Sequence, residues 1–198
     1  MIVGVEQGAA ILREGGVIAY PTETVYGLGA DPSREPAVHR LCELKGREAS
    51  RGFSVLVTGI EEFLRWAPDA PRPARCLAER FWPGPLTIVV PVHGHVLAPV
   101  ATILGVGFRC SAHPTSTALL EHAGRPIVST SCNRTGREPC QTAEEVRACF
   151  GAGLAVAGGE PAGGQPASTV VTVSATGELE LVREGAIPFA EVRSETNE

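Results

Sequence analysis

The chain contains one lysine, Lys45, in a segment that is otherwise rich in arginine. The sequence has 17 lysine and arginine residues in all, so every other basic residue is an arginine. A lysine in that background predicts a site that needs a compact, rotatable ammonium rather than a planar guanidinium. Arg47 and Arg51 follow closely, and cations so near to one another repel unless an anion joins them. The segment therefore predicts an anion site, with phosphate as the best match.

Two simpler explanations for Lys45 stay open at this point. A chain with a strong arginine bias can keep a single lysine anywhere by chance. In addition, the helix predicted over residues 37–44 would put Lys45 at its C-terminal end, where the helix dipole favours a cation.

Polar side chains lie at or near the ends of several predicted strands. They are Thr22, Thr24, Arg109, Ser129, Ser131, Asn133, Ser168 and Arg183. Because α/β proteins place ligands where strands run into loops, these residues are candidates for one binding site. Each also has a structural explanation, since hydroxyls and amides close turns and Arg109 can pair with a carboxylate at the edge of the core.

Several common nucleotide-binding and catalytic motifs are absent from the sequence. Lys45 is followed by Gly46 and Arg47, which excludes a P-loop, and no G-x-G-x-x-G opens a helix after a strand. H-E-x-x-H and G-x-S-x-G are absent as well. A nucleotide would therefore have to be bound by another arrangement.

The cysteines and histidines do not suggest a metal site. The cysteines are widely spaced and form no C-x-x-C pair, which is typical of reduced thiols rather than a disulfide framework. They are Cys42, Cys76, Cys110, Cys132, Cys140 and Cys149. The close histidine pair His93 and His95 is expected in a solvent-exposed loop without a third ligand nearby.

Composition narrows the class of protein further. The net charge of −5 argues against a non-specific nucleic-acid binder but leaves room for a local basic cleft. No apolar run reaches the roughly 18 residues of a membrane-spanning helix. The N-terminus lacks the cationic and apolar regions of a signal peptide, so a cytoplasmic location is expected.

The hydrophobic pattern predicts an α/β fold, with one domain over residues 1–198 and a twisted, mixed, open sheet flanked by helices. Strands are predicted at 17–20, 53–57, 86–90, 105–110, 127–129, 154–157, 170–173 and 180–182. Helices are predicted at 5–14, 37–44, 61–66, 74–81, 115–123 and 143–150. Residues 21–29, rich in hydroxyls and glycines, are predicted as a loop at the ligand site. Residues 158–166 are predicted as a lid or a plain linker.

Several segments together carry a resemblance to a known family. They are Ala19–Gly29, Lys45–Arg47, Trp82–Thr87, Arg109 with His113 and Pro114, Val128–Gly136, Ser168–Val171 and Arg183–Gly185. In order and spacing they resemble the YrdC-like threonylcarbamoyl-AMP synthases, in the short, single-domain bacterial form. The resemblance covers nearly the whole chain and implies a YrdC-like fold.

The resemblance also implies an activity and its partners. The chain is expected to be a nucleotidyltransferase that makes threonylcarbamoyl-AMP and pyrophosphate from L-threonine, bicarbonate and ATP. ATP is expected as a substrate accompanied by Mg²⁺, without assigned protein ligands for the metal. The product would pass to a threonylcarbamoyl-transferase complex that modifies tRNA, and no membrane partner is expected.

Residue roles follow from the same resemblance. The catalytic residues would be Lys45, Arg47, Ser131 and Asn133. ATP would be bound by Arg47, Arg51, Ser131, Cys140 and Arg183, and L-threonine by Thr24, Arg109, Ser129 and Ser168. The chain departs from the family pattern at Glu48, at Arg51–Phe53, at Cys132 and at Arg134–Thr135. These departures leave the positioning around Arg51 and Cys132 open.

Two other functions stay open from the sequence. One is an RNA-binding module of the same fold, which a steep salt dependence of RNA binding without nucleotide turnover would indicate. The other is a carbamoyl-transfer domain like that of hydrogenase-maturation proteins, which would depend on carbamoyl phosphate rather than threonine.

Overall fold

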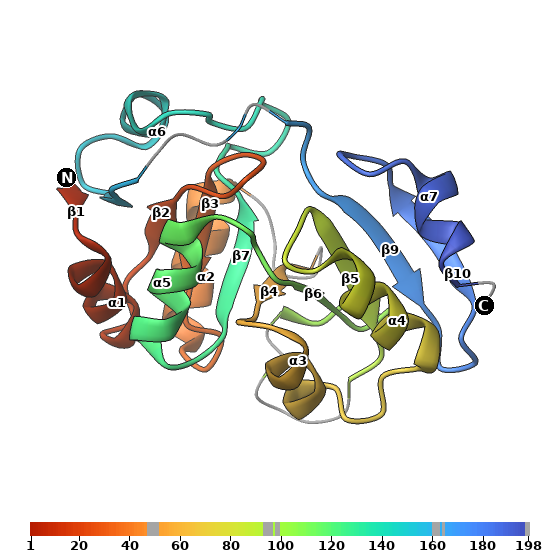
Figure 1. Ribbon diagram of the computed structural model, residues 1–198. Coiled ribbons are helices and arrows are strands. Elements are labelled where there is room, and N and C mark those ends of the chain that lie inside the picture. Colours follow the sequence, from red (N-terminus) through yellow and green to blue (C-terminus); the bar gives the residue numbers. More distant parts are fainter. Residues whose placement is uncertain (47–51, 93–96, 98–99, 160–162, 164, 197–198) are drawn as a thin grey trace.

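The centre of the fold is one mixed β-sheet. The structure is a computed structural model that describes residues 1–46, 52–92, 97, 100–159, 163 and 165–196. The strands of this part of the chain follow the order β1-β8-β2-β3-β7-β4-β6-β5-β9-β10 across the sheet (Figure 1). Their bounds are Ile2–Val3 (β1), Ile18–Tyr20 (β2), Gly27–Ala30 (β3), Ser54–Leu56 (β4), Leu86–Val90 (β5), Val106–Arg109 (β6), Ile127–Ser131 (β7), Ala155–Ala157 (β8), Thr169–Val173 (β9) and Leu179–Arg183 (β10).

Strand directions place the predicted site segments next to one another. β2 is parallel to β8 and antiparallel to β3, and β3 is antiparallel to β7. On the other side of β7, β4 pairs antiparallel to it and parallel to β6. The register of β3 and β7 sets Gly27 opposite Ser131 and Gly29 opposite Ser129. Segments far apart in the sequence therefore meet at the middle of the sheet.

The helices of the described chain, apart from the last one, lie close to their predicted positions. They are Val5–Arg13 (α1), Glu35–Lys45 (α2), Ile60–Trp66 (α3), Arg72–Phe81 (α4), Pro114–Ala123 (α5), Ala143–Phe150 (α6) and Phe189–Ser194 (α7). Helix α2 contains Pro36 in its first turn. Gly46 caps its C-terminal end with a φ of 64°, a left-handed conformation that glycine adopts most easily. Lys45 is its last residue, as predicted. None of these helices is long and apolar enough to cross a membrane.

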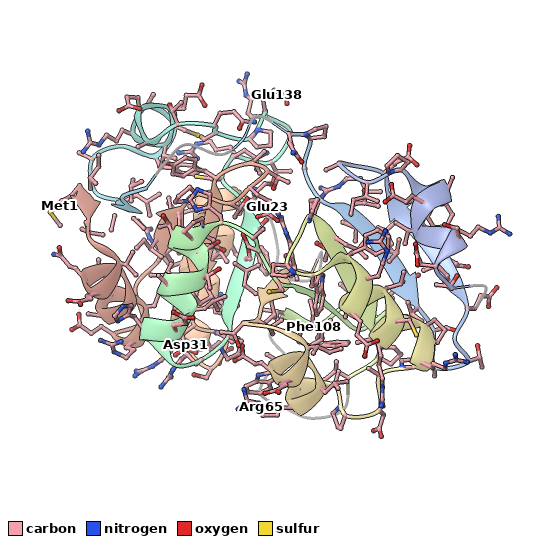
Figure 2. The ribbon with its side chains drawn as sticks, in the orientation of Figure 1. Met1, Glu23, Asp31, Arg65, Phe108 and Glu138 are labelled. Atoms are coloured by element: carbon pink, nitrogen blue, oxygen red, sulfur yellow. The ribbon has the colours of Figure 1, made fainter. Side chains whose placement is uncertain are left out.

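Two hydrophobic clusters hold the helices on the sheet. Helices α1 and α5 lie beside each other, and Leu12 and Leu119 pack there with Ile18 of β2 (Figure 1). The larger cluster gathers the apolar faces of α2, α3 and α4, and in it the ring of Phe108 meets that of Phe63 edge-on at 5.1 Å. Figure 2 shows Phe108 inside the molecule, whereas Arg65 lies at its periphery.

The α/β fold with a mixed sheet is confirmed, but the sequence missed three elements. Strand β3 includes residues 27–29 of the stretch 21–29 that was predicted as a loop, so that part of the prediction was wrong. Its four residues, Gly27–Ala30, include no β-branched or aromatic side chain, which removes the usual strand signal. Strand β1 and helix α7 are short terminal elements that were also not predicted.

Gly105, just before β6, offers a test of the backbone there. Its φ is 116°, and a Cβ on it would lie 2.0 Å from the carbonyl oxygen of Val90. We expect Gly105→Ala to lose about 3 kcal/mol or more of unfolding free energy in urea denaturation, because backbone strain and a backbone clash add. The control is Gly124→Ala, where φ is 67° and nothing lies within 4 Å of the added Cβ. It should lose only about 1 kcal/mol, and equal losses would contradict the clash.

Candidate active site

A cavity of about 630 Å³ lies over the middle of the sheet, lined by residues of β3 to β7, β9 and β10. Seven of the residues predicted from strand ends line it: Thr22, Thr24, Arg109, Ser129, Ser131, Ser168 and Arg183. One side of the rim is apolar and includes Ile103, Leu104 and Val182. The structure therefore brings most of the predicted site residues to one place, while their roles stay predictions.

Lys45 joins the end of α2 to the segment that follows β7. Its Nζ donates to the carbonyl oxygen of Ser131 at 2.6 Å and also to Oδ1 of Asn133. The ammonium lies 3.4 Å from Oγ of Ser131, and Lys45 is only 3% exposed. Thr135 completes the junction, because its N–H and its hydroxyl both donate to the carbonyl oxygen of Lys45 at 2.9 Å. Three of the residues predicted to be catalytic, Lys45, Ser131 and Asn133, are thus in direct contact.

Ser131 and Asn133 are oriented by their own hydrogen bonds. Oγ of Ser131 donates to Oδ1 of Asn133 at 2.7 Å, and Nδ2 of Asn133 donates to the carbonyl oxygen of Arg137. Oδ1 therefore accepts from both Ser131 and Lys45, which fixes the orientation of the amide. Ser131 lines the cavity, so this bonded group presents a polar surface to it.

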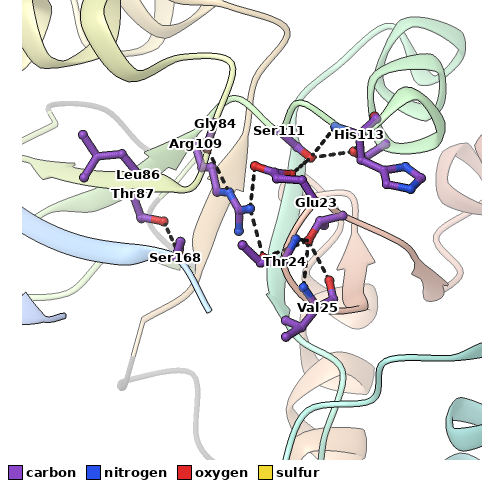
Figure 3. A network of polar contacts seen from close by, with 12 residues as sticks. Glu23, Thr24, Val25, Gly84, Leu86, Thr87, Arg109, Ser111, His113 and Ser168 are labelled. Carbon is purple, nitrogen blue, oxygen red and sulfur yellow. Dashed lines mark hydrogen bonds and ion pairs between the residues drawn. The ribbon is translucent and has the colours of Figure 1, made fainter. Parts of the chain in front are cut away.

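Arg109 lies at the centre of a second polar network, shown in Figure 3. Its Nη2 lies 2.8 Å from Oε1 of Glu23 and donates to Oγ1 of Thr24 at 3.1 Å. Nε donates to the carbonyl oxygen of Gly84 at 3.4 Å. The contact with Oε1 is an ion pair without the alignment of a hydrogen bond. Nη1 has no hydrogen-bond partner among the described residues, so that end of the guanidinium can bind a ligand.

Glu23 belongs to this network, although the sequence analysis did not single it out as a site residue. Its carboxylate also accepts a hydrogen bond from Ser111, whose Oγ in turn accepts from Ser116 at 2.8 Å. Burial alone would raise the pKa of Glu23, but the charge of Arg109 and the hydrogen bond from Ser111 lower it. The available signal was its place between Thr22 and Thr24, together with the expectation that Arg109 can pair with a carboxylate at the edge of the core.

Arg183 and Ser168 form the opposite wall of the cavity. Nη2 of Arg183 donates to the carbonyl oxygen of Ser168 at 2.8 Å, and Oγ of Ser168 lies 3.0 Å from Oγ1 of Thr87. Burial, and then the charge of Arg109, lower the pKa of Arg183. Two arginines thus act on each other across one cavity, and an anion between them would relieve that repulsion.

Three of the predicted ATP-binding residues are not placed at the cavity. Arg47 and Arg51 lie outside the described residues. Cys140 is buried away from the lining, and its N–H donates to the carbonyl oxygen of Cys132 at 2.8 Å. The hydrogen bond with the Cys140 thiol, and burial, raise the pKa of the Cys132 thiol. In the stretch 158–166, residues 160–162 and 164 lie outside the described chain, so the lid stays a prediction.

The described residues were also compared with the ligand sets that proteins use for metals. Among them, no group of three or more histidine, cysteine, aspartate or glutamate side chains is arranged to hold a metal ion. The carboxylate beside the cavity, Glu23, is already engaged by Arg109 and Ser111.

The ion pair of Glu23 and Arg109 predicts a pH-dependent stability. We expect Glu23→Gln to lower the unfolding free energy at neutral pH by about 2 kcal/mol, because it leaves a buried guanidinium without its counter-charge. Since the pKa of Glu23 is lowered in the folded protein, its contribution is present at neutral pH and is lost as the pH falls through that pKa. Urea denaturation from pH 7 downward should show the two proteins converging in acid. A constant difference would contradict the assignment.

The sequence of this chain is similar to a known family and to several named proteins. The Sua5/YciO/YrdC family model, described as telomere recombination, matches residues 10–185. A threonylcarbamoyl-AMP synthase of Nitrosococcus oceani is 42% identical over 153 residues, which are 76% of this chain and 82% of the relative. A threonylcarbamoyl-AMP synthase of Escherichia coli O1:K1 is 39% identical over 178 residues, which are 85% of this chain and 90% of the relative.

A solved structure extends the similarity to three dimensions. The crystal structure of P. abyssi Sua5 complexed with L-threonine has a TM-score of 0.87 and 34% identity. The match covers 96% of this chain and 56% of that one, so the chain spans a little over half the length of that protein. On the family model, the relatives and the fold together, the chain belongs to the Sua5/YciO/YrdC family.

Proposed function

We propose that the chain is a threonylcarbamoyl-AMP synthase that uses L-threonine, bicarbonate and ATP. The observation that carries the proposal is the single cavity that Arg109, Arg183 and Ser131 share, with Lys45 bonded directly behind Ser131. Such a site suits substrates that bring a carboxylate and a triphosphate together. Family relatives at about 40% identity bear the name of this activity.

Catalysis of this reaction requires mainly positive charge near the phosphates and correct orientation of the substrates. The neutral amine of threonine captures carbon dioxide as a carbamate with loss of a proton, or captures bicarbonate with loss of water. A carbamate oxygen then attacks the α-phosphorus of ATP, a new P–O bond forms, and the bond to the leaving pyrophosphate breaks. Charge accumulates on phosphoryl oxygens and on pyrophosphate, which fixed cations stabilise. The reaction is thus a nucleotidyl transfer.

Arg109 is the proposed anchor for the carboxylate of L-threonine. Glu23, Thr24 and Gly84 hold Nη2 and Nε, which leaves Nη1 directed to a ligand. A guanidinium held in this way binds a carboxylate with little loss of side-chain entropy. Thr24, Ser129 and Ser168 surround the same space and would bind the rest of the amino acid.

Lys45 is the proposed point charge near the reacting phosphate. Ser131 and Asn133 hold its ammonium with neutral oxygens, which orient it without adding negative charge. Arg183 would bind phosphate oxygens from the opposite wall, and Arg47 and Arg51 are proposed to do so from the segment after α2. Cys140 stays a predicted ATP-binding residue, although it is buried outside the cavity lining.

Magnesium is proposed to enter as a complex with ATP, held by the phosphates. Mg²⁺ commonly keeps several waters and few protein ligands in sites that bind nucleotide phosphates. The Glu23 carboxylate is committed to Arg109 and Ser111, so it does not fit the role of a metal ligand.

The product is proposed to pass in the cytoplasm to a threonylcarbamoyl-transferase complex acting on tRNA. The names of the relatives do not favour the RNA-binding or carbamoyl-transfer alternatives.

The proposed activity has a direct assay. Purified protein, incubated with ATP and magnesium, should release pyrophosphate only when both L-threonine and bicarbonate are present. Omitting either one should reduce release to background, and carbamoyl phosphate should not replace them. Release that ignores threonine or bicarbonate would overturn the proposal.

The identity of the cation at position 45 offers a sharper test. We expect Lys45→Arg to lose at least about tenfold in kcat, because a planar guanidinium cannot reproduce the contacts of a buried ammonium with Ser131 and Asn133. Arg147→Lys, an exchange on the exposed face of α6, is the control and should leave kcat unchanged. Melting temperatures separate misfolding from lost chemistry, and Lys45→Met shows the effect of removing the charge. Wild-type turnover in Lys45→Arg would contradict the assigned role.

A further inference from the structure

Tyr20 connects the core of the sheet to the wall of the cavity. It lies at the end of β2 and is fully buried, with an exposed fraction of 0%. Its phenol hydroxyl donates to Oγ of Ser129 on β7 at 2.7 Å. Strand β3 lies between β2 and β7, so the side chain of Tyr20 must cross a whole strand to make this contact.

Two glycines of β3 make this crossing possible. A Cβ on Gly27 would lie 2.9 Å from Cζ of Tyr20, and a Cβ on Gly29 would lie 2.7 Å from Cε1. Real Cβ atoms do not approach a ring so closely, because such distances fall well inside van der Waals contact. The ring therefore lies across β3 where side chains are missing. The tyrosine explains the glycine at 27, and the glycine at 29 leaves room both for the ring and for the side chain of Ile127.

The hydrogen bond also determines what Ser129 can offer to a ligand. A serine hydroxyl has one proton and two lone pairs. One lone pair of Ser129 accepts from Tyr20, and the serine proton has no acceptor among the described residues. Burial raises the pKa of Tyr20, so its phenol stays protonated and remains a donor. Ser129 lines the cavity, where its own proton can point toward a bound group.

Ser131, two residues further along β7, has a different hydrogen-bonding state. Its hydroxyl proton is given to Oδ1 of Asn133, so it presents lone pairs rather than a donor. Ser129 can therefore donate a hydrogen bond to a ligand, whereas Ser131 can only accept one, although both belong to β7. The charges of Arg109 and Arg183 in the same cavity favour an anionic group beside Ser129.

We infer that Tyr20 is a positioning residue, which holds Ser129 as a hydrogen-bond donor to an anionic oxygen of the threonine-derived substrate. The inference rests on the proposed function, since it is that function which brings a carboxylate and then a carbamate into this space. Tyr20 does not touch the substrate itself. It acts through Ser129, and the glycines of β3 act through Tyr20.

A double-mutant cycle tests this inference. We expect Tyr20→Phe and Ser129→Ala each to raise the KM for L-threonine, Ser129→Ala by roughly tenfold and Tyr20→Phe by a little less. The KM for ATP should change less than about twofold. The double variant should be no worse than Ser129→Ala alone, because Tyr20 has no further effect once its partner is absent. Pyrophosphate release gives all the constants.

A matched control separates positioning from lost stability. Thr142→Ala removes the hydroxyl that caps α6 by accepting the N–H of Glu145, and Thr142 is not part of the cavity lining. It should lower the melting temperature without changing the KM for L-threonine. If Tyr20→Phe also lowers only the melting temperature, or if its effect adds fully to that of Ser129→Ala, the inference is overturned.

Calorimetric binding of L-threonine without ATP keeps this test independent of the proposed function. If wild-type protein releases no threonine-dependent pyrophosphate but binds threonine, the proposed function fails and the cycle can still be measured as dissociation constants. If turnover is normal and both readouts are the same for Tyr20→Phe and wild type, only the role of Tyr20 fails.

Discussion

The junction between Lys45 and the segment after β7 is the contact on which the rest of the site depends. It ties residues separated by more than eighty positions, through the Lys45 ammonium on one side and the Thr135 bonds to the Lys45 carbonyl on the other. A buried ammonium is costly to desolvate, so it must be met by well-placed oxygens. Ser131 and Asn133 provide them, and their own orientation is set in return.

The two arginines of the cavity show how the same fold treats two positive charges differently. Arg109 has a carboxylate partner in Glu23, which offsets the cost of burying the guanidinium and holds it in one orientation. Arg183 is held by the main chain and hydroxyl of Ser168 instead, with no acidic partner within ion-pair distance among the described residues. Arg109 is thus held in one orientation by its carboxylate partner. The charge of Arg183 is not balanced by a carboxylate, so it can attract an incoming anion.

Much of the fold could be predicted because its helices and buried strands follow hydrophobic periods. Helix α2 was clear from its apolar spacing and its Gly46 end, and so was the place of Lys45. Strand β3 could not be found in this way, since glycines carry no hydrophobic pattern and their role depends on the Tyr20 ring from a neighbouring strand. The prediction of one domain over residues 1–198 stays a prediction.

For the site, too, the sequence predicts single residues, whereas contacts between residues far apart in the sequence require the fold. Residue types and order identified Thr24, Arg109, Ser129, Ser131 and Ser168, and the structure places them around one cavity. The partnership of Glu23 with Arg109 required the fold, because the two residues are 86 positions apart in the sequence. Cys140 was expected at the nucleotide, but the structure shows only its buried position beside Cys132.

The passage of the Tyr20 ring over β3 has a consequence for how this sequence can change. Positions 20, 27, 29 and 129 form one spatial unit, so the effect of a substitution at any of them depends on the residues at the others. A smaller residue at 20 would release the constraint on Gly27 but only part of that on Gly29, where a Cβ would still lie 2.7 Å from Cγ2 of Ile127. A side chain at 27 would be tolerated only after that loss. Substitution histories and combinatorial libraries should therefore show strong epistasis among these four positions, which single-site scans would record only as intolerance.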